Sequence, residues 1–288
     1  RGRGSLADLE AQGRGSVSEL QAKGMSHLEE AKGMSSDRLA DMGIDAEGRV
    51  YFTMQLVDGR DVKDIITLAE KGEEGWDQRR VVGVLIRVCE ALAYAHSKGV
   101  VHRDIKPGNI MVGKFGEVFL MDWGLAKVMG REEELDGQMS SIMHTLRSDH
   151  ASAEQTLAGD VVGTPAFMAP EQAFGVADDV GPASDLYAVG AILYYMLAGQ
   201  LPYQPLGESV GALTILEAVK NGPPWPVQKL KPEAPPELVA ICEKAMARKV
   251  EDRFSDAMDL AGELRDWLEG NAVATYETSA FYSVRKWV

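Results

Sequence analysis

The 288-residue sequence has few cysteines and no long apolar run. Its two cysteines, Cys89 and Cys242, fall within apolar helical patterns, where a reduced thiol behaves as a small hydrophobic residue. A disulfide framework or a cysteine-rich metal site is therefore not expected. The longest apolar stretch, residues 188–199, is shorter than the roughly 20 residues that a membrane span requires. These features predict a reducing, cytoplasmic setting and no membrane span in this chain.

Positive charge is also scarce. The sequence has 30 Lys and Arg against 44 Asp and Glu, a formal net charge of -14. Such a chain repels a phosphate backbone unless its basic residues gather on one face, and the sequence has no basic cluster. Nucleic acid is therefore not expected as a partner. The 45% hydrophobic and 26% charged residues are typical of a globular protein with a sizeable core.

The first forty residues contain a short repeat. The sequence Gly-Arg-Gly-Ser at residues 2–5 returns at residues 13–16, and later units shorten to Gly-Met-Ser. Serine can cap a helical turn and glycine interrupts one, so residues 1–42 are predicted to form a Gly/Ser repeat segment that is helical or flexible. The Gly-x-Gly units have no third glycine and no strand before them, which argues against a phosphate-binding loop.

From residue 43 the pattern becomes that of a globular domain. Its predicted elements are a strand over 50–54, helices over 80–96, 186–197, 238–246 and 260–268, and a hairpin that joins 110–112 to 118–121. Ser255 is the predicted N-cap of the last helix and Gly270 its terminator. Residues 131–160 are predicted to be a long polar loop, and the tail after 271 shows no pattern.

Three segments carry groups suited to phosphoryl transfer. The first is His-Arg-Asp-Ile-Lys-Pro-Gly-Asn at residues 102–109, and the second is Asp-Trp-Gly at 122–124, after an apolar strand. The third is Gly-Thr-Pro-Ala-Phe-Met-Ala-Pro-Glu at 163–171. Phosphoryl transfer needs carboxylates that hold metal ions, a carboxylate near the attacking hydroxyl and cations on the phosphate. In these segments the chain resembles the catalytic C-lobe of a Ser/Thr protein kinase of the bacterial type.

The resemblance implies a role for each residue of the catalytic loop. Asp104 would orient or deprotonate the substrate hydroxyl, and Lys106 would contact the γ-phosphate of ATP. Asn109 would bind the second Mg²⁺, so Lys106 and Asn109 also belong to the nucleotide site. Thr164 would bridge Asp104 and Lys106.

The resemblance also implies where ATP and Mg²⁺ bind. Asp122 would chelate Mg²⁺ across the ATP phosphates, with a tryptophan in place of the family's usual phenylalanine at the next position. That departure is expected to change the energetics of the loop and to retain metal binding. Met54 would be the gatekeeper, the backbone of Gln55 and Val57 would meet adenine, and Asp61 would reach the ribose.

Other residues are implied to support or regulate the site. Glu171 would form a buried ion pair with Arg253, and Asp185 would hydrogen-bond the catalytic-loop backbone, the alternative being a plain helix N-cap. Arg103 would respond to phosphate on the activation segment, with Thr156 as the predicted autophosphorylation site and a homodimer as the expected assembly for that reaction. Competing sites in the same loop are Ser140, Ser141, Thr145, Ser148 and Ser152.

The N-lobe of such a kinase is reduced in this sequence. About fifty residues precede Met54, whereas an N-lobe normally supplies ~80 to 90, with a Gly-rich loop and a lysine in Val-Ala-x-Lys. No lysine of the sequence stands in that context. Either the sequence is a segment of a longer or damaged reading frame, or it is a degenerate kinase.

The expected fold is therefore α+β and protein-kinase-like, mainly the helical C-lobe with a reduced or missing N-lobe sheet, over residues 43–270 with a tail at 271–288. The expected function is transfer of phosphate from ATP, with Mg²⁺, to Ser or Thr of protein substrates. One alternative is a pseudokinase or scaffold that lacks the N-lobe lysine. Another, a small-molecule phosphotransferase, is opposed by the Ala-Pro-Glu segment at 169–171.

Overall fold

The computed structural model describes residues 39–44, 50–54, 57–129, 165–175, 179–204 and 210–278. The chain divides into two compact units, residues 1–57 and residues 58–288. The predicted loop at 131–160, the proposed phosphorylation site Thr156 within it, and the site candidates Gln55 and Thr164 lie outside the described residues.

In the first unit, two antiparallel strands form a hairpin. β1 (Leu39–Ile44) pairs with β2 (Val50–Met54) so that Ile44 lies opposite Val50, and a bulge interrupts the ladder near Leu39. The strand predicted over 50–54 is thus present as β2. β1 begins ahead of residue 43, where the pattern suggested that the globular domain starts. The three predicted segments, 1–42, 43–270 and 271–288, stay a proposal.

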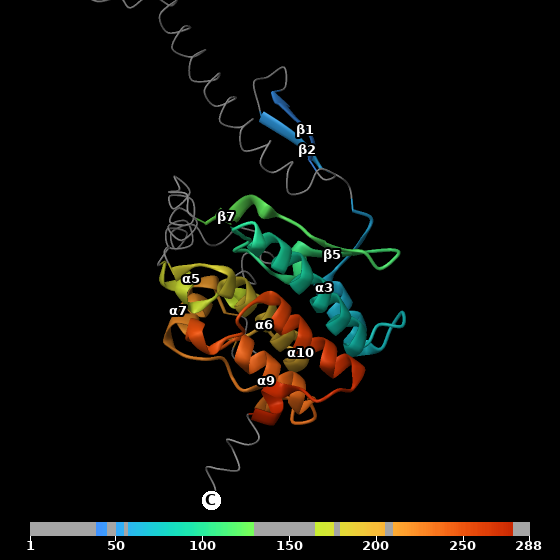
Figure 1. Cartoon of the computed structure of the whole chain (residues 1–288), viewed down its shortest axis with the longest axis vertical. Helices are drawn as coiled ribbons and strands as arrows, with labels where there is room; N and C mark the ends of the chain where they lie inside the picture. The colour runs from blue at the N-terminus through green and yellow to red at the C-terminus, as the bar shows by residue number, and fades with distance from the viewer. Residues whose placement is uncertain are drawn as a thin grey trace, which may run out of the picture. The chain divides into compact units, whose positions relative to one another are not determined.

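The second unit is mainly helical (Figure 1). Its helices are α2 (Val62–Lys71), α3 (Gln78–Ser97), α5 (Pro170–Phe174), α6 (Pro182–Ala198), α7 (Ala212–Asn221), α8 (Val227–Leu230), α9 (Pro236–Ala245) and α10 (Ala257–Glu269). The four helices predicted from apolar patterns correspond to α3, α6, α9 and α10. Single 3-10 turns are η1 (Pro107–Asn109), η2 (Trp123–Leu125), η4 (Pro165–Phe167) and η6 (Val250–Asp252).

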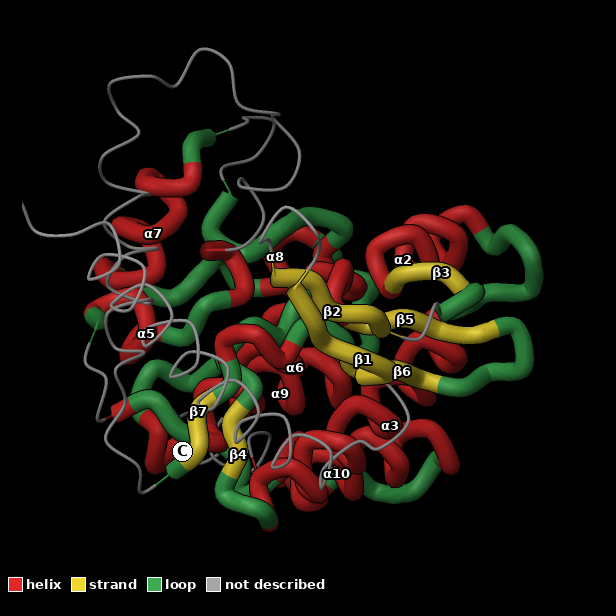
Figure 2. Tube along the Cα trace, turned by 90° about the horizontal axis from the view of Figure 1, so that it is seen from above, coloured by secondary structure: helices red, strands yellow, loops and turns green. Residues whose placement is uncertain are grey.

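The described residues of the second unit also form two small antiparallel sheets (Figure 2). β3 (Gly59–Asp61), β5 (Ile110–Gly113) and β6 (Val118–Leu120) lie side by side in that order, and β4 (Val100–Val101) pairs with β7 (Lys127–Val128). The hairpin predicted around residues 113–116 is therefore present as β5 and β6, with Ile110 opposite Leu120. Helices with small sheets give the α+β class that the sequence predicted.

Helix α6 is the centre of the core. It is apolar on nearly every side and contacts α3, α9 and α10, so most of its side chains are buried. It packs tightly against the end of α9, where a Cβ added at Gly190 would lie 2.7 Å from the Cβ of Ala245 and 2.9 Å from the Cγ of Met246. Glycine at this position therefore permits two helices to pack backbone against backbone.

We expect Gly190→Ala to lower the free energy of unfolding by about 1 to 3 kcal/mol, because the added methyl group overpacks the contact between α6 and α9. The matched control is Gly262→Ala in α10, where no atom lies within 4 Å of an added Cβ. There, alanine should be neutral or stabilise by up to about 1 kcal/mol through helix propensity. Urea unfolding of both variants measures the difference, and equal midpoints would contradict this packing account.

The ends of α10 partly match the prediction. Gly270 terminates the helix in the left-handed conformation, as predicted. The prediction that Ser255 is the N-cap was wrong: Asp256 caps α10 by accepting the backbone N–H of Asp259 at 2.8 Å. The Ser255 hydroxyl instead donates to the Asp259 carboxylate at 3.0 Å, because Ser255 stands one residue too early to cap.

Both cysteines are buried and free, as the apolar patterns predicted. Burial raises the pKa of the Cys89 thiol to about 12 and also raises that of Cys242 above its ordinary value. Thiols in such surroundings stay protonated and unreactive. Among the described residues, no helix is both long and apolar enough to cross a lipid bilayer.

Candidate active site

The catalytic loop runs from β4 to η1 and brings three predicted site residues together. The Asp104 carboxylate lies 2.9 Å from Lys106 Nζ and accepts a hydrogen bond from Asn109 Nδ2, also at 2.9 Å. The same amide group donates to the Asp104 carbonyl at 2.8 Å. Asp104 therefore faces one cation and one amide donor, with its side chain 12% exposed, which leaves it open to a substrate hydroxyl.

Asp185, in α6, holds the backbone of this loop by hydrogen bonds. It is 1% exposed, and its two carboxylate oxygens accept the backbone N–H groups of His102 and Arg103, each at 2.9 Å. The alternative of a plain N-cap is not what the structure has, because Gly181 is the N-cap of α6. A third partner is His96 at the end of α3, whose Nε2 lies 2.8 Å from the same carboxylate.

We expect Asp185→Asn to lower the free energy of unfolding by about 1.5 to 3 kcal/mol, the range for hydrogen bonds to a charged group. An asparagine presents one amide nitrogen where the wild type presents an acceptor, so one backbone N–H loses its partner. The matched control is Asp259→Asn in α10, an exposed carboxylate bonded to Ser255. Chemical unfolding monitored by circular dichroism would distinguish them, and equal stability would contradict the role of Asp185.

The catalytic loop also has an unusual backbone. Arg103 has φ +69° and Asp122 has φ +59°, both in the left-handed region that non-glycine residues rarely adopt. Such residues cost of order 1 to 3 kcal/mol and are held by their surroundings. Arg103 is held by Asp185, and its Nε donates to the carbonyl of Leu125, which joins the catalytic loop to the segment after Asp122.

The hairpin of β5 and β6 carries Asn109 and Asp122 to the same end of the ladder. Asn109 precedes β5, and its carbonyl accepts the N–H of Met121 at 2.7 Å, directly before Asp122. Trp123, in place of the family's phenylalanine, donates its indole N–H to the carbonyl of Leu120 at 3.0 Å. Phenylalanine cannot make that bond, so the tryptophan adds a tether to the turn that carries Asp122.

His102 links the two segments in its neutral form. Its Nδ1 accepts the N–H of Asp104 at 3.3 Å, its Nε2 lies 2.9 Å from the Met121 carbonyl, and its ring packs at 4.5 Å from that of Trp123. An acceptor at Nδ1 requires an unprotonated nitrogen there, so the partners assign the proton to Nε2. Burial lowers the pKa of His102, although nearby Asp185 opposes that shift, which agrees with a neutral ring.

The donor set can accept a divalent cation that also binds phosphate. Asp122 is exposed, and Asn109 uses its amide nitrogen on Asp104, so the amide oxygen is the atom that can bind a metal ion. Mg²⁺ in phosphate sites uses one or two protein oxygens together with substrate oxygens and water. Among the described residues there is no group of three or more His, Cys, Asp or Glu that could hold a metal ion by itself.

The ion pair predicted between α5 and the segment before α10 is present. Arg253 Nη1 and Nη2 bind the two oxygens of Glu171 at 2.7 and 2.8 Å, and the Ser184 hydroxyl donates to Glu171 at 2.7 Å. Burial would raise the pKa of Glu171, but the hydrogen bonds and charge of Arg253, with the bond from Ser184, hold it below its usual value. The carboxylate is therefore ionised in the folded protein.

The nucleotide-binding predictions outside the catalytic loop stay predictions. Met54 ends β2 and Val57 is half-buried, both in the first unit. Asp61 lies in the second unit, where its side chain caps α2 by accepting the N–H of Asp64 at 2.8 Å. That cap is a structural use of Asp61 that the sequence reading did not include.

Two residues at the site were missed by sequence reasoning. His96 reads as an ordinary last-turn residue of α3, and nothing near it in the sequence shows that it meets Asp185. Gln172 follows Glu171 and reads as a helix residue, yet its amide donates to the Arg103 carbonyl. Both act across more than 60 positions of sequence, where local patterns carry no signal.

Comparison with known proteins agrees with this geometry. The family model described as "Protein kinase domain" matches residues 37–264. The chain belongs to the protein kinase family. The kinase domain is 36% identical over 235 residues to the "Serine/threonine-protein kinase PknD" of Protochlamydia amoebophila and 34% identical over 230 residues to that of Chlamydia trachomatis. It is 33% identical over 226 residues to the "Probable serine/threonine-protein kinase PknB" of Bifidobacterium longum.

These alignments cover most of the kinase domain and little of the relatives. They include 77%, 77% and 78% of this chain, but 23%, 24% and 29% of the three relatives. The chain thus spans about a quarter of the length of the relatives that it matches. The resemblance to bacterial Ser/Thr kinases is confirmed, as is the α+β kinase-like fold.

Proposed function

We propose that this kinase domain transfers the γ-phosphate of ATP to Ser or Thr hydroxyls of protein substrates. The observation that carries the proposal is the convergence of Lys106 and Asn109 on Asp104, in a loop whose backbone is tied to buried Asp185. The names of the bacterial relatives support the same activity. Protein kinases in general use ATP with a divalent metal ion.

In this proposal each residue has one task. Asp104 accepts the proton of the substrate hydroxyl or orients it, and Lys106 contacts the transferred phosphate. A bound Mg²⁺ would neutralise charge on the ATP phosphates, and Asp122 and Asn109 are the residues that would hold it. Thr164 would bridge Asp104 and Lys106, and Met54, Gln55, Val57 and Asp61 would surround adenine and ribose.

Regulation is a further part of the proposal. Arg103 would bind phosphate on the activation segment after autophosphorylation at Thr156, between two copies of the chain. A cytoplasmic location fits both the reduced, buried cysteines and such a reaction.

A pseudokinase or scaffold remains the second candidate because no lysine of the sequence stands in the Val-Ala-x-Lys context. Such a protein could bind nucleotide or partner proteins and transfer no phosphate. The complete set of Asp104, Asn109 and Asp122 favours the enzyme.

The experiment compares Mg²⁺-dependent ATP binding and phosphate transfer in the wild type and in Asp122→Asn. We expect the variant to bind Mg²⁺-ATP about 10- to 100-fold more weakly, the usual effect of weakening a metal site. Its affinity for ATP in EDTA should be unchanged. The matched control is Asp256→Asn, since asparagine caps a helix as well as aspartate does. Equal Mg²⁺ dependence in both variants would remove Asp122 from the metal site.

A further inference from the structure

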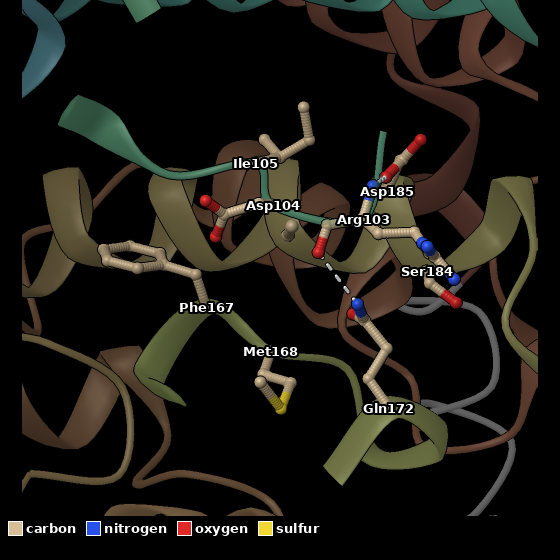
Figure 3. Close-up of a pocket in the computed structure, with 9 residues that line it drawn as sticks. Arg103, Asp104, Ile105, Phe167, Met168, Gln172, Ser184 and Asp185 are labelled. Carbon is tan, nitrogen blue, oxygen red and sulfur yellow. Dashed lines mark hydrogen bonds between the residues drawn. The ribbon is translucent and has the colours of Figure 1, made fainter. Parts of the chain in front are cut away.

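Gln172, which directly follows the Ala-Pro-Glu segment at 169–171, joins α5 to the catalytic loop. It lies in α5 directly after Glu171 and is 4% exposed. Its Nε2 donates to the carbonyl oxygen of Arg103 at 2.9 Å, and its Oε1 accepts the N–H of Ala169 at 3.2 Å. Figure 3 shows the first of these bonds reaching from α5 to the loop, beside a small hollow next to Asp104.

The carbonyl that Gln172 holds belongs to the peptide group that leads into Asp104. The N–H of that same peptide group donates to His102 Nδ1 at 3.3 Å, so the peptide plane is held on both of its edges. Arg103 has a φ of +69°, in the left-handed region that L-residues rarely adopt. The orientation of this plane therefore depends on its hydrogen-bond partners.

Helix α5, which carries Gln172, is itself held in place, so the hydrogen bond from Gln172 to Arg103 starts from a fixed position. Glu171, the neighbour of Gln172, is fixed by Arg253 and Ser184 through buried hydrogen bonds. Asp185 holds the loop by its N–H groups, and Gln172 holds it by a carbonyl, so the two residues constrain different edges. Asp185 cannot replace Gln172, because a carboxylate does not donate to a carbonyl.

We propose that Gln172 is a positioning residue that sets the direction of the Asp104 carboxylate and couples it to the Ala-Pro-Glu segment. The inference rests on the proposed phosphate transfer, since positioning matters only if Asp104 acts on a substrate. A displacement of α5 would pass through Gln172 to the peptide group before Asp104.

The test uses Gln172→Met in the full chain, which keeps the side-chain length and removes the donor. The matched control is Gln200→Met, because Gln200 also donates its amide to a backbone carbonyl, that of Gln204 at 3.3 Å, away from the loop. We expect kcat to fall about 10- to 100-fold, the usual effect of a small misplacement of a reacting group. The KM for ATP should change by less than about threefold, because ground-state binding is retained.

Hydrogen exchange provides a second readout that does not depend on activity. The Asp104 amide should exchange about tenfold faster in Gln172→Met, the effect of losing roughly one hydrogen bond, while amides of α3 and α6 stay unchanged. If this variant fails to fold, Gln172→Leu replaces it, because leucine also lacks the donor and brings no charge into the buried site.

Equal kcat and equal Asp104 exchange in the Gln172 and Gln200 variants would overturn the inference. A wild type that transfers no phosphate would overturn the proposed function instead. In that case the exchange rate of the Asp104 amide alone decides whether Gln172 positions the loop, so the two failures are distinguishable.

Discussion

The Asp104→Asn variant is expected to transfer phosphate about 10²- to 10⁴-fold more slowly than the wild type, the range for loss of a general base. Asparagine has the size of aspartate and keeps an oxygen for Lys106 or Asn109, but it cannot accept the proton of a hydroxyl. The affinity for ATP should stay within about threefold, because in the proposed function Asp104 would contact the reacting hydroxyl and not the nucleotide. Steady-state transfer and nucleotide titration of the same sample measure both quantities.

The matched control for Asp104→Asn is Asp256→Asn, the same substitution at the N-cap of α10, far along the sequence from the catalytic loop. This control should leave transfer and stability unchanged, because asparagine is an equally good N-cap. If Asp104→Asn kept the wild-type rate, Asp104 would not be the catalytic carboxylate, whatever the other motifs suggest.

The second large effect concerns stability. Arg253→Met should lower the free energy of unfolding by about 3 to 5 kcal/mol, because it leaves the Glu171 carboxylate buried with no cation. The variant also loses the bonds from Arg253 to the carbonyls of Ala183 and Ala247, at 2.9 and 2.8 Å. Denaturant unfolding gives the free energy directly.

The matched control for Arg253→Met is Arg265→Met, since Arg265 also binds a carboxylate, that of Glu90 at 2.9 Å. The side chains of that pair are 39% and 32% exposed. Solvent screening should therefore limit the loss of unfolding free energy in Arg265→Met to about 0 to 1 kcal/mol. Equal losses of unfolding free energy in the two variants would show that burial does not make the Glu171–Arg253 pair more stabilising than an exposed pair.

The same ion pair predicts a dependence on pH. The folded-state pKa of Glu171 lies below its usual value, so the ionised form is favoured in the folded protein. Ionised Glu171 therefore stabilises the folded protein at pH values above the pKa of an unfolded glutamate, about 4.3. That stabilisation is lost as the pH falls toward the lower pKa of the folded state. The stability difference between wild type and Glu171→Gln should accordingly be largest near pH 7 and shrink in acid. A difference that grows in acid would reverse this assignment.

Sequence patterns predicted the core helices, and the resemblance to kinase motifs identified the catalytic loop, because the residues of each lie close together in the sequence. The apolar periodicity of α3 and the continuous apolar run of α6 predict that these helices are buried. The loop from His102 to Asn109 is a single contiguous segment. The resemblance could therefore name these residues in advance; the structure brings Asp104, Lys106 and Asn109 together, and their roles stay predictions. The buried pair of Glu171 with Arg253 came only from the family resemblance, and the structure has it.

Other features depend on contacts that no local pattern encodes. Helix α2 begins at a cap made by Asp61, which the resemblance had assigned to ribose, and α8 is a four-residue helix that directly follows Pro226. Ser255 and Asp256 are adjacent residues of types that can both cap a helix, and only the geometry shows that Asp256 caps α10. Gln172 was missed for the same reason. Its partner is the backbone carbonyl of Arg103, and every residue has such a group, so the sequence gives no sign of the contact.

The most direct test of this account is identification of the product. The wild-type chain is incubated with ATP, Mg²⁺ and a generic basic protein, and modified residues are identified by mass spectrometry, with ATP binding measured on the same sample. The account predicts phosphoserine or phosphothreonine in the wild type and their loss in Asp104→Asn. A folded wild-type chain that binds ATP and leaves every hydroxyl unmodified would contradict it and would favour a nucleotide-binding scaffold.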